Sequence, residues 1–158
     1  MKTILQIIKN KGGLEKLKEG DESIKVENGP YMDLHIEYIG EGPHGYDSVS
    51  VAHYFEQNGD LMKDPEMCFE VRDVEILKIV KGASKVVIEN VLVPYLFIQD
   101  GGRFSRYDEV YTTDDDGKIV RTDQNLLYQL KRFAEQWDKN IKQQGFVTAS
   151  KVKKGGQK

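Results

Sequence analysis

The sequence has little of several residue types on which particular protein classes depend. It holds one cysteine, Cys68, so no disulfide can form within the chain, and this favours a reducing compartment. No apolar run approaches the roughly 18 residues that a membrane helix needs. The apolar stretch Ile4 to Ile8 is interrupted by Gln6 and followed by no small-residue cleavage site. We therefore expect no membrane association and no secretory signal, and we predict a cytoplasmic protein.

The chain also lacks an excess of basic charge. Its net charge of −3 makes nucleic acid a poor candidate partner. Residues 148–158 contain four lysines and no acid, and we expect a flexible basic tail there. The rest of the chain is correspondingly more acidic, with a cluster at Asp108, Glu109 and 114–116. Another protein that docks on this acidic surface is the candidate partner. The composition does not define an oligomeric state.

What is present is a helix, then a run of strands, then a second helix. Residues 3–11 carry Ile4, Leu5, Ile7 and Ile8 on one stripe, with Thr3 as the expected N-cap and Gly12-Gly13 as the end. From Ile24 the apolar period changes to two, which is typical of half-buried strands. Pro94 is expected to interrupt the later strands. The expected strands cover residues 24–26, 32–38, 49–56, 67–71, 74–80, 85–93, 95–99 and 107–112.

The clearest element is the C-terminal helix. Leu126, Leu130, Phe133, Trp137 and Ile141 recur at steps of three and four, so they share one helix face. Capping by Asp123 or Thr122 is expected. The order predicts an α+β fold, in which one antiparallel sheet of about five to seven strands is packed by this helix and by the short N-terminal one. We expect a single domain over residues 1–147.

One segment resembles a known family. The stretch from Val49 to Val71 contains His53-Tyr54-Phe55-Glu56-Gln57-Asn58-Gly59-Asp60, followed by Leu61-Met62-Lys63-Asp64-Pro65-Glu66-Met67. It is similar to a family of uncharacterised bacterial proteins met on plasmids, phages and conjugative elements. The resemblance implies a mobile-element setting. It implies no activity and no catalytic residue.

The candidate surface or binding residues lie in the first strands and their turns. They are His35, Glu37, His53, Glu56, Asp60 and Asp64. His53 shares an apolar face with Val51 and Phe55, so a core histidine is the preferred interpretation. Cys68 lies beside Glu66 and Glu70, whose charges raise a thiol pKa and disfavour a nucleophile. No catalytic residue, metal ion or cofactor is assigned.

The function is unknown from sequence, and three hypotheses stay open. The first is a non-catalytic protein-interaction or accessory module of a bacterial mobile element. The second is a small metal-dependent hydrolase that uses His35, His53 and nearby carboxylates. The third is a small-molecule site between the sheet and a helix.

Overall fold

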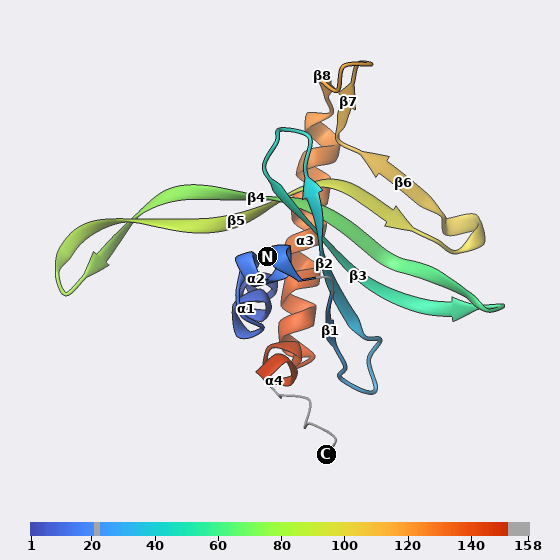
Figure 1. The fold of residues 1–158 in the computed structure, drawn as a ribbon, viewed down its shortest axis with the longest axis horizontal. Coiled ribbons are helices and arrows are strands. Elements are labelled where there is room, and N and C mark those ends of the chain that lie inside the picture. Colours follow the sequence, from blue (N-terminus) through green and yellow to red (C-terminus); the bar gives the residue numbers. More distant parts are fainter. Residues whose placement is uncertain (21–22, 152–158) are drawn as a thin grey trace.

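The computed structural model describes residues 1–20 and 23–151. Six antiparallel strands form one sheet, in which each strand pairs with its neighbours along the chain (Figure 1). They are β1 (Ile24–Val26), β2 (Leu34–Glu41), β3 (Asp47–Gln57), β4 (Asp60–Val80), β5 (Ala83–Gln99) and β6 (Arg106–Glu109). A separate hairpin joins β7 (Tyr111–Thr113) to β8 (Ile119–Thr122). The fold is α+β, as predicted.

Helices cover one face of the sheet. They are α1 (Lys2–Asn10), α2 (Leu14–Glu19), α3 (Gln124–Gln143) and α4 (Phe146–Lys151), with a 3-10 turn η1 (Gly102–Phe104) before β6. The core between α1, α3, α4 and the sheet contains Ile4, Ile7, Leu34, Val51, Phe69, Phe97 and Phe146, all nearly or fully buried. Each strand has only one strongly apolar face, so the sheet depends on these helices to keep that face from water.

Helix α3 has the predicted stripe and the predicted cap. The Asp123 carboxylate accepts a hydrogen bond from the Leu126 backbone N–H at 2.9 Å. Leu130, Trp137 and Ile141 are buried. Phe133 belongs to the predicted face of the helix but is 40% exposed, although its ring packs edge-on against Phe97 at 5.1 Å between centroids.

The predicted N-cap of the first helix is wrong. The helix begins at Lys2, so Thr3 lies within it. The Asp138 carboxylate, from α3, accepts hydrogen bonds from the backbone N–H of Thr3 at 3.1 Å and from its hydroxyl at 3.0 Å. An acceptor at a helix N-terminus satisfies N–H groups that lack partners within the helix. A residue distant in sequence therefore takes the place of the local cap.

The later strands are longer than predicted. Residues 67–71 and 74–80 belong to one strand, β4, and residues 85–93 and 95–99 belong to β5. Pro94 does not interrupt β5. It lies beside a register shift, where Phe69 pairs with Pro94 but Cys68 pairs with Leu96. A bulge tolerates the missing N–H of proline, so the strand continues.

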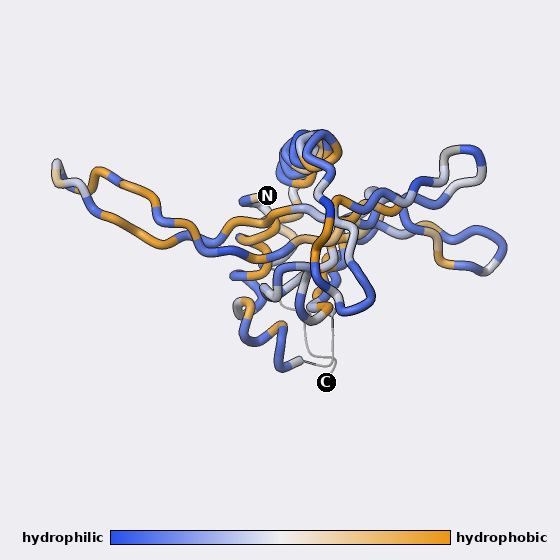
Figure 2. The backbone as a smooth tube through the Cα atoms, turned by 90° about the horizontal axis from the view of Figure 1, so that it is seen from above, coloured by the Kyte–Doolittle hydropathy of each residue, from blue (hydrophilic) through white to orange (hydrophobic). Residues whose placement is uncertain are grey.

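The distal part of this long hairpin leaves the body of the molecule. We call residues 72–80 and 83–92 the arm. Figure 1 shows it as a twisted two-stranded ribbon extending away from the helices, and Figure 2 shows hydrophobic residues along its length. Lys81 and Gly82, both with positive φ, form the turn at its tip.

Part of the predicted tail is helical. Residues 148–151 belong to α4, in which Phe146 and Ser150 are buried. The Asn10 side chain donates a hydrogen bond to the Ser150 hydroxyl at 2.8 Å and so ties α4 to α1. The rest of the predicted tail, 152–158, lies outside the described residues. Of the helices formed by residues 1–20 and 23–151, none has the length and apolar character needed to cross a membrane.

Candidate functional site

The two strand histidines do not meet. Across β2 and β3, Leu34 pairs with His53 and His35 pairs with Ala52. Directly paired residues share a face and successive residues alternate, so His35 and His53 point to opposite faces of the sheet. The expectation that both serve one hydrolase site has no geometric support.

His53 is a core residue with a satisfied ring nitrogen, in agreement with the preferred interpretation. It is 7% exposed, and its Nδ1 lies 3.0 Å from the Asp33 carbonyl oxygen. Its ring centroid lies 5.6 Å from that of Trp137 and 5.7 Å from that of Phe146. Burial lowers the pKa of His53, which keeps the imidazole neutral. The side chain helps to hold α3 and α4 on the sheet.

The other predicted site residues are dispersed. Glu37 is exposed on β2, and Glu56 and Asp60 are exposed at the turn between β3 and β4. Asp64 is half-buried and accepts a hydrogen bond from the Gln99 amide at 3.1 Å. His35 packs edge-on against Tyr54 with centroids 5.1 Å apart, and burial lowers its pKa. These side chains form no common pocket.

Metal and thiol chemistry receive no structural support. In the part of the chain that the structure describes, no three His, Cys, Asp or Glu side chains are grouped so that they can hold a metal ion. Cys68 is buried, and burial together with the charge of Glu66 raises its pKa to about 12. The thiol is therefore held in the unreactive protonated form.

The predicted acidic cluster is divided between two elements. Asp108 and Glu109 lie on β6, and Asp108 forms an ion pair with Arg106. Asp114 begins the turn between β7 and β8, where its carboxylate accepts hydrogen bonds from the backbone N–H groups of Asp116 and Lys118. The cluster includes side chains that already stabilise local structure.

A buried carboxylate that sequence reasoning missed lies where the arm joins the body. Glu70 on β4 is fully buried. Its Oε1 accepts the backbone N–H of His44 at 2.6 Å, and its Oε2 lies 2.9 Å from His44 Nδ1 and 2.5 Å from Arg72 Nη2. Burial alone raises the pKa of Glu70, but the hydrogen bonds from Arg72 and His44 outweigh it and lower the pKa below its ordinary value.

This cluster fastens the loop after β2 to the root of the arm. Arg72 lies over the Tyr46 ring at 4.9 Å, and the His44 ring packs edge-on against Tyr111 at 4.6 Å. A Cβ at Gly42 would lie 2.4 Å from the Glu70 side chain, so only glycine lets the loop approach. A glutamate within an alternating strand looks solvated in sequence, and only the loop contact reveals its burial.

The two faces of the arm differ in exposure. On the first face, Ile76 pairs with Val87, both are partly buried, and an ion pair between Lys78 and Glu89 spans them. On the other face, Leu77 pairs with Val86, Glu75 with Ile88, and Ile79 with Ser84. The four large aliphatic residues of this second face form what we call the aliphatic patch: Leu77, Ile79, Val86 and Ile88, which are 69%, 79%, 59% and 68% exposed.

Both edges of the arm are also free. Strand β3 pairs with β4 only as far as Glu70, and β6 pairs with β5 only from Leu96. Within the described ranges, the strands of the arm therefore pair only with each other. A two-stranded ribbon is marginally stable alone in water, and an exposed apolar face with free edges is typical of an interaction surface.

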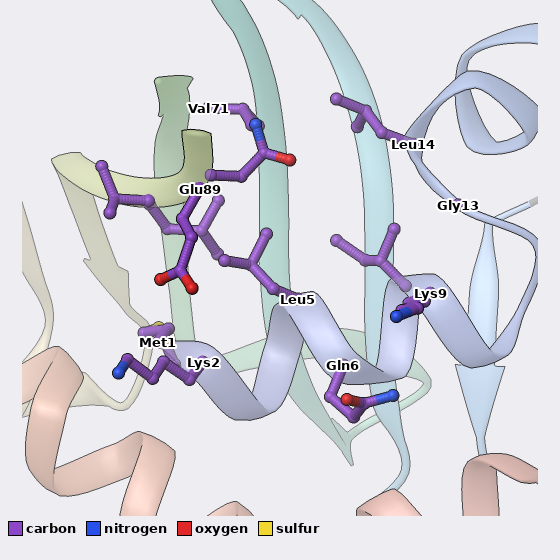
Figure 3. Close-up of a pocket in the computed structure, with 13 residues that line it drawn as sticks. Met1, Lys2, Leu5, Gln6, Lys9, Gly13, Leu14, Val71 and Glu89 are labelled. Carbon is purple, nitrogen blue, oxygen red and sulfur yellow. The ribbon is translucent and has the colours of Figure 1, made fainter. Parts of the chain in front are cut away.

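A groove lies where the arm meets the first helix. We call it the arm groove; it has a volume of about 570 Å³ and lies between α1, α2 and β5. Leu5 and Leu14 face Val71 across it (Figure 3). A second hollow of about 1010 Å³ continues past Leu14 to Tyr46, Asp47 and Arg72. The groove lies between a helix and the sheet, the position predicted for a small-molecule site. Its lining combines aliphatic side chains with Lys2, Gln6, Lys9, Glu89 and Asn90.

The sequence contained one signal for the arm, its richness in Val and Ile over residues 74–80 and 85–93.

Comparison with known proteins adds no activity. Searches of curated proteins and of solved structures found no match to the chain. A family model described as a domain of unknown function (DUF6908) matches residues 2–147. The chain therefore belongs to the DUF6908 family.

Proposed function

We propose that this domain is a non-catalytic protein-interaction module whose docking element is the arm. The observation that carries the proposal is the aliphatic patch, four large side chains that are 59–79% exposed on one face of a ribbon with free edges. The resemblance of residues 49–71 to proteins of bacterial mobile elements supports a setting there.

Burial of the aliphatic patch by a partner would contribute a substantial part of a binding free energy. Full burial of one such side chain is worth about 1.5–3 kcal/mol. At the observed exposures, the four together offer about 4–8 kcal/mol in gross transfer free energy, before the cost of association. The acidic cluster offers less, because Asp108 and Asp114 already have intramolecular partners and exposed ion pairs contribute little.

The test is affinity capture from a bacterial lysate with matched variants. Leu77→Thr/Ile88→Thr removes half of the patch and keeps strand-forming, β-branched residues. Leu61→Thr/Val120→Thr is the control, since these residues are 66% and 62% exposed but lie elsewhere. We expect bound protein to be retained by the wild type and the control and lost by the arm variant. Equal capture by the arm variant, with an unchanged circular dichroism spectrum, contradicts the proposal.

A further inference from the structure

The aliphatic patch continues the face of the sheet that the helices cover. Val71 pairs with Leu92, and both are 8% exposed within the core. Two residues further along each strand, Asp73 pairs with Asn90, and then the patch begins. Because alternate residues share a face, Val71, Asp73, Glu75, Leu77 and Ile79 all lie on one side of β4. The cover supplied by α1 ends at the arm groove, and the same face runs on without cover.

Charge is distributed unevenly along the arm. Residues 76–88 contain Lys78, Lys81 and Lys85 and no acidic residue, so the tip is basic. Lys78 and Lys85 lie on the face opposite the patch, where Lys78 forms an ion pair with Glu89, and Lys81 lies in the turn itself. The root carries Asp73 and Glu75 on the face of the patch. Glu15 and Asp47 line the neighbouring hollow, but both form ion pairs with Lys18. The other basic groups near the root are Arg72, which binds Glu70, and Lys2 and Lys9, which border the arm groove. One chain therefore carries both a basic tip and acidic groups at the root.

From these features we infer that the partner of the arm is a second copy of this chain. The aliphatic patches of two arms pack face to face and antiparallel, and the tip of each arm lies at the arm groove of the other copy. This inference rests on the proposed function. An antiparallel arrangement sets Lys81 of one copy near Asp73 and Glu75 of the other, whereas a parallel arrangement would gather the lysines of both tips. Such a contact is self-complementary about a twofold axis, as the interface of a homodimer must be.

The area that two arms can bury against each other is too small for a stable dimer, so the arm groove must contribute to the contact. At about 3.3 Å per residue, the nine residues from 72 to 80 span about 30 Å, and two strands are about 10 Å wide. One face of the arm then offers about 300 Å², or about 600 Å² for two copies, which is below the roughly 1,000 Å² of a specific interface. Seating each tip in a groove of about 570 Å³ supplies the missing contact.

The oligomeric state of the purified full chain tests the inference. Native mass spectrometry and sedimentation up to about 100 µM should show a dimer for the wild type. Leu77→Thr/Ile88→Thr should raise the dimer dissociation constant at least about 100-fold, and Leu61→Thr/Val120→Thr should leave it unchanged. A monomeric wild type, with or without a small-molecule adduct in its mass, overturns the inference. Capture of another protein that depends on the arm would then still support the proposed function.

A charge exchange tests the antiparallel arrangement. Lys81→Glu and Glu75→Lys should each weaken the dimer about tenfold, because each change places like charges together at two symmetric contacts. The double variant, in which the charges are exchanged, should recover the wild-type constant. The antiparallel packing is contradicted if neither single variant changes the dimer dissociation constant. It is also contradicted if the double variant weakens the dimer by the sum of the two single effects.

A disulfide cross-link tests whether the tip of one arm lies at the arm groove of the other copy. Ser84 pairs with Ile79 near the tip and lies on the face of the patch. Ser84→Cys is separated from Leu14→Cys in the groove by the length of the arm, so a disulfide between them joins two copies. Mixed under mild oxidation, these variants should give a covalent dimer, while Ser84→Cys mixed with Leu61→Cys should not. If the protein dimerises but no disulfide forms with Leu14→Cys, the tip does not lie at the groove, and this part of the inference is overturned.

Discussion

The buried Glu70 cluster permits a quantitative prediction. In the variant Glu70→Gln, one carboxylate oxygen becomes an amide N–H₂ that faces the donors of Arg72 and His44. A hydrogen bond to a charged group contributes about 1.5–3 kcal/mol, and breaking a buried pair costs about 3–5 kcal/mol. Because Gln keeps one acceptor and the shape of the side chain, we expect the free energy of unfolding at pH 7 to fall by about 3 kcal/mol. Urea denaturation followed by circular dichroism measures it.

The same cluster predicts a pH dependence. The pKa of Glu70 is lowered in the folded state, so its stabilisation is present above the pKa of the unfolded chain, about 4.3. It is lost as the pH falls through the lower, folded pKa. The difference between the wild type and Glu70→Gln should therefore be constant from pH 7 to about pH 5 and shrink below about pH 4.

The control is Glu56→Gln on the neighbouring strand β3, where the side chain is exposed and lies outside the arm. Its cost should stay within about 0.5 kcal/mol. If Glu70→Gln costs no more than this control, or if its cost does not change with acidification, Glu70 is not the charged, buried acceptor that its contacts describe.

Three further perturbations test the packing. Trp137→Ala should cost about 3–5 kcal/mol, because the indole is 7% exposed; a loss below about 1 kcal/mol in urea denaturation would refute the packing of α3. Gly42→Ala should cost about 1–3 kcal/mol, since its Cβ meets a Glu70 side chain held by three hydrogen bonds, whereas Gly29→Ala, with open space, should cost less. The folded state lowers the pKa of His53, so the unfolded chain takes up a proton near pH 6.5 that the folded chain does not. Wild-type stability should thus fall from pH 7.5 to 5 more than that of His53→Gln; parallel curves would contradict a neutral, buried imidazole.

The site illustrates where local pattern stops being informative. The position of His53 beside Val51 correctly indicated a core residue. The pKa of Cys68 is raised, but burial is the larger cause, and Glu66 is the acid that contributes. Glu70 obeys the alternation of its strand, yet it is fully buried, because a loop near residue 44 folds over it. Burial of a polar strand residue depends on what covers the sheet, and the strand itself does not encode that cover.

The helices and turns show the same difference between features set by nearby residues and features set by distant ones. The spacing of Leu130, Trp137 and Ile141 and the Asp123 cap were sufficient to identify α3, since helix formation and capping involve residues three or four apart. The start of α1 could not be identified in this way, because the carboxylate that accepts its N-terminal hydrogen bonds, Asp138, lies 135 residues from Thr3. The turn at Asn58 and Gly59, both with positive φ, follows from local chemistry.

The amino-acid sequence alone determined the α+β class, the two packing helices and the alternation of the strands, because period and turn chemistry are local properties. Only the tertiary structure decided that residues 60–80 and 83–99 are continuous strands, that their distal part leaves the body as an arm, and that the aliphatic patch is exposed. A run of Val and Ile is equally compatible with a buried strand and with an exposed one. Which of the two it becomes depends on where α1 ends and on whether another chain supplies the missing cover.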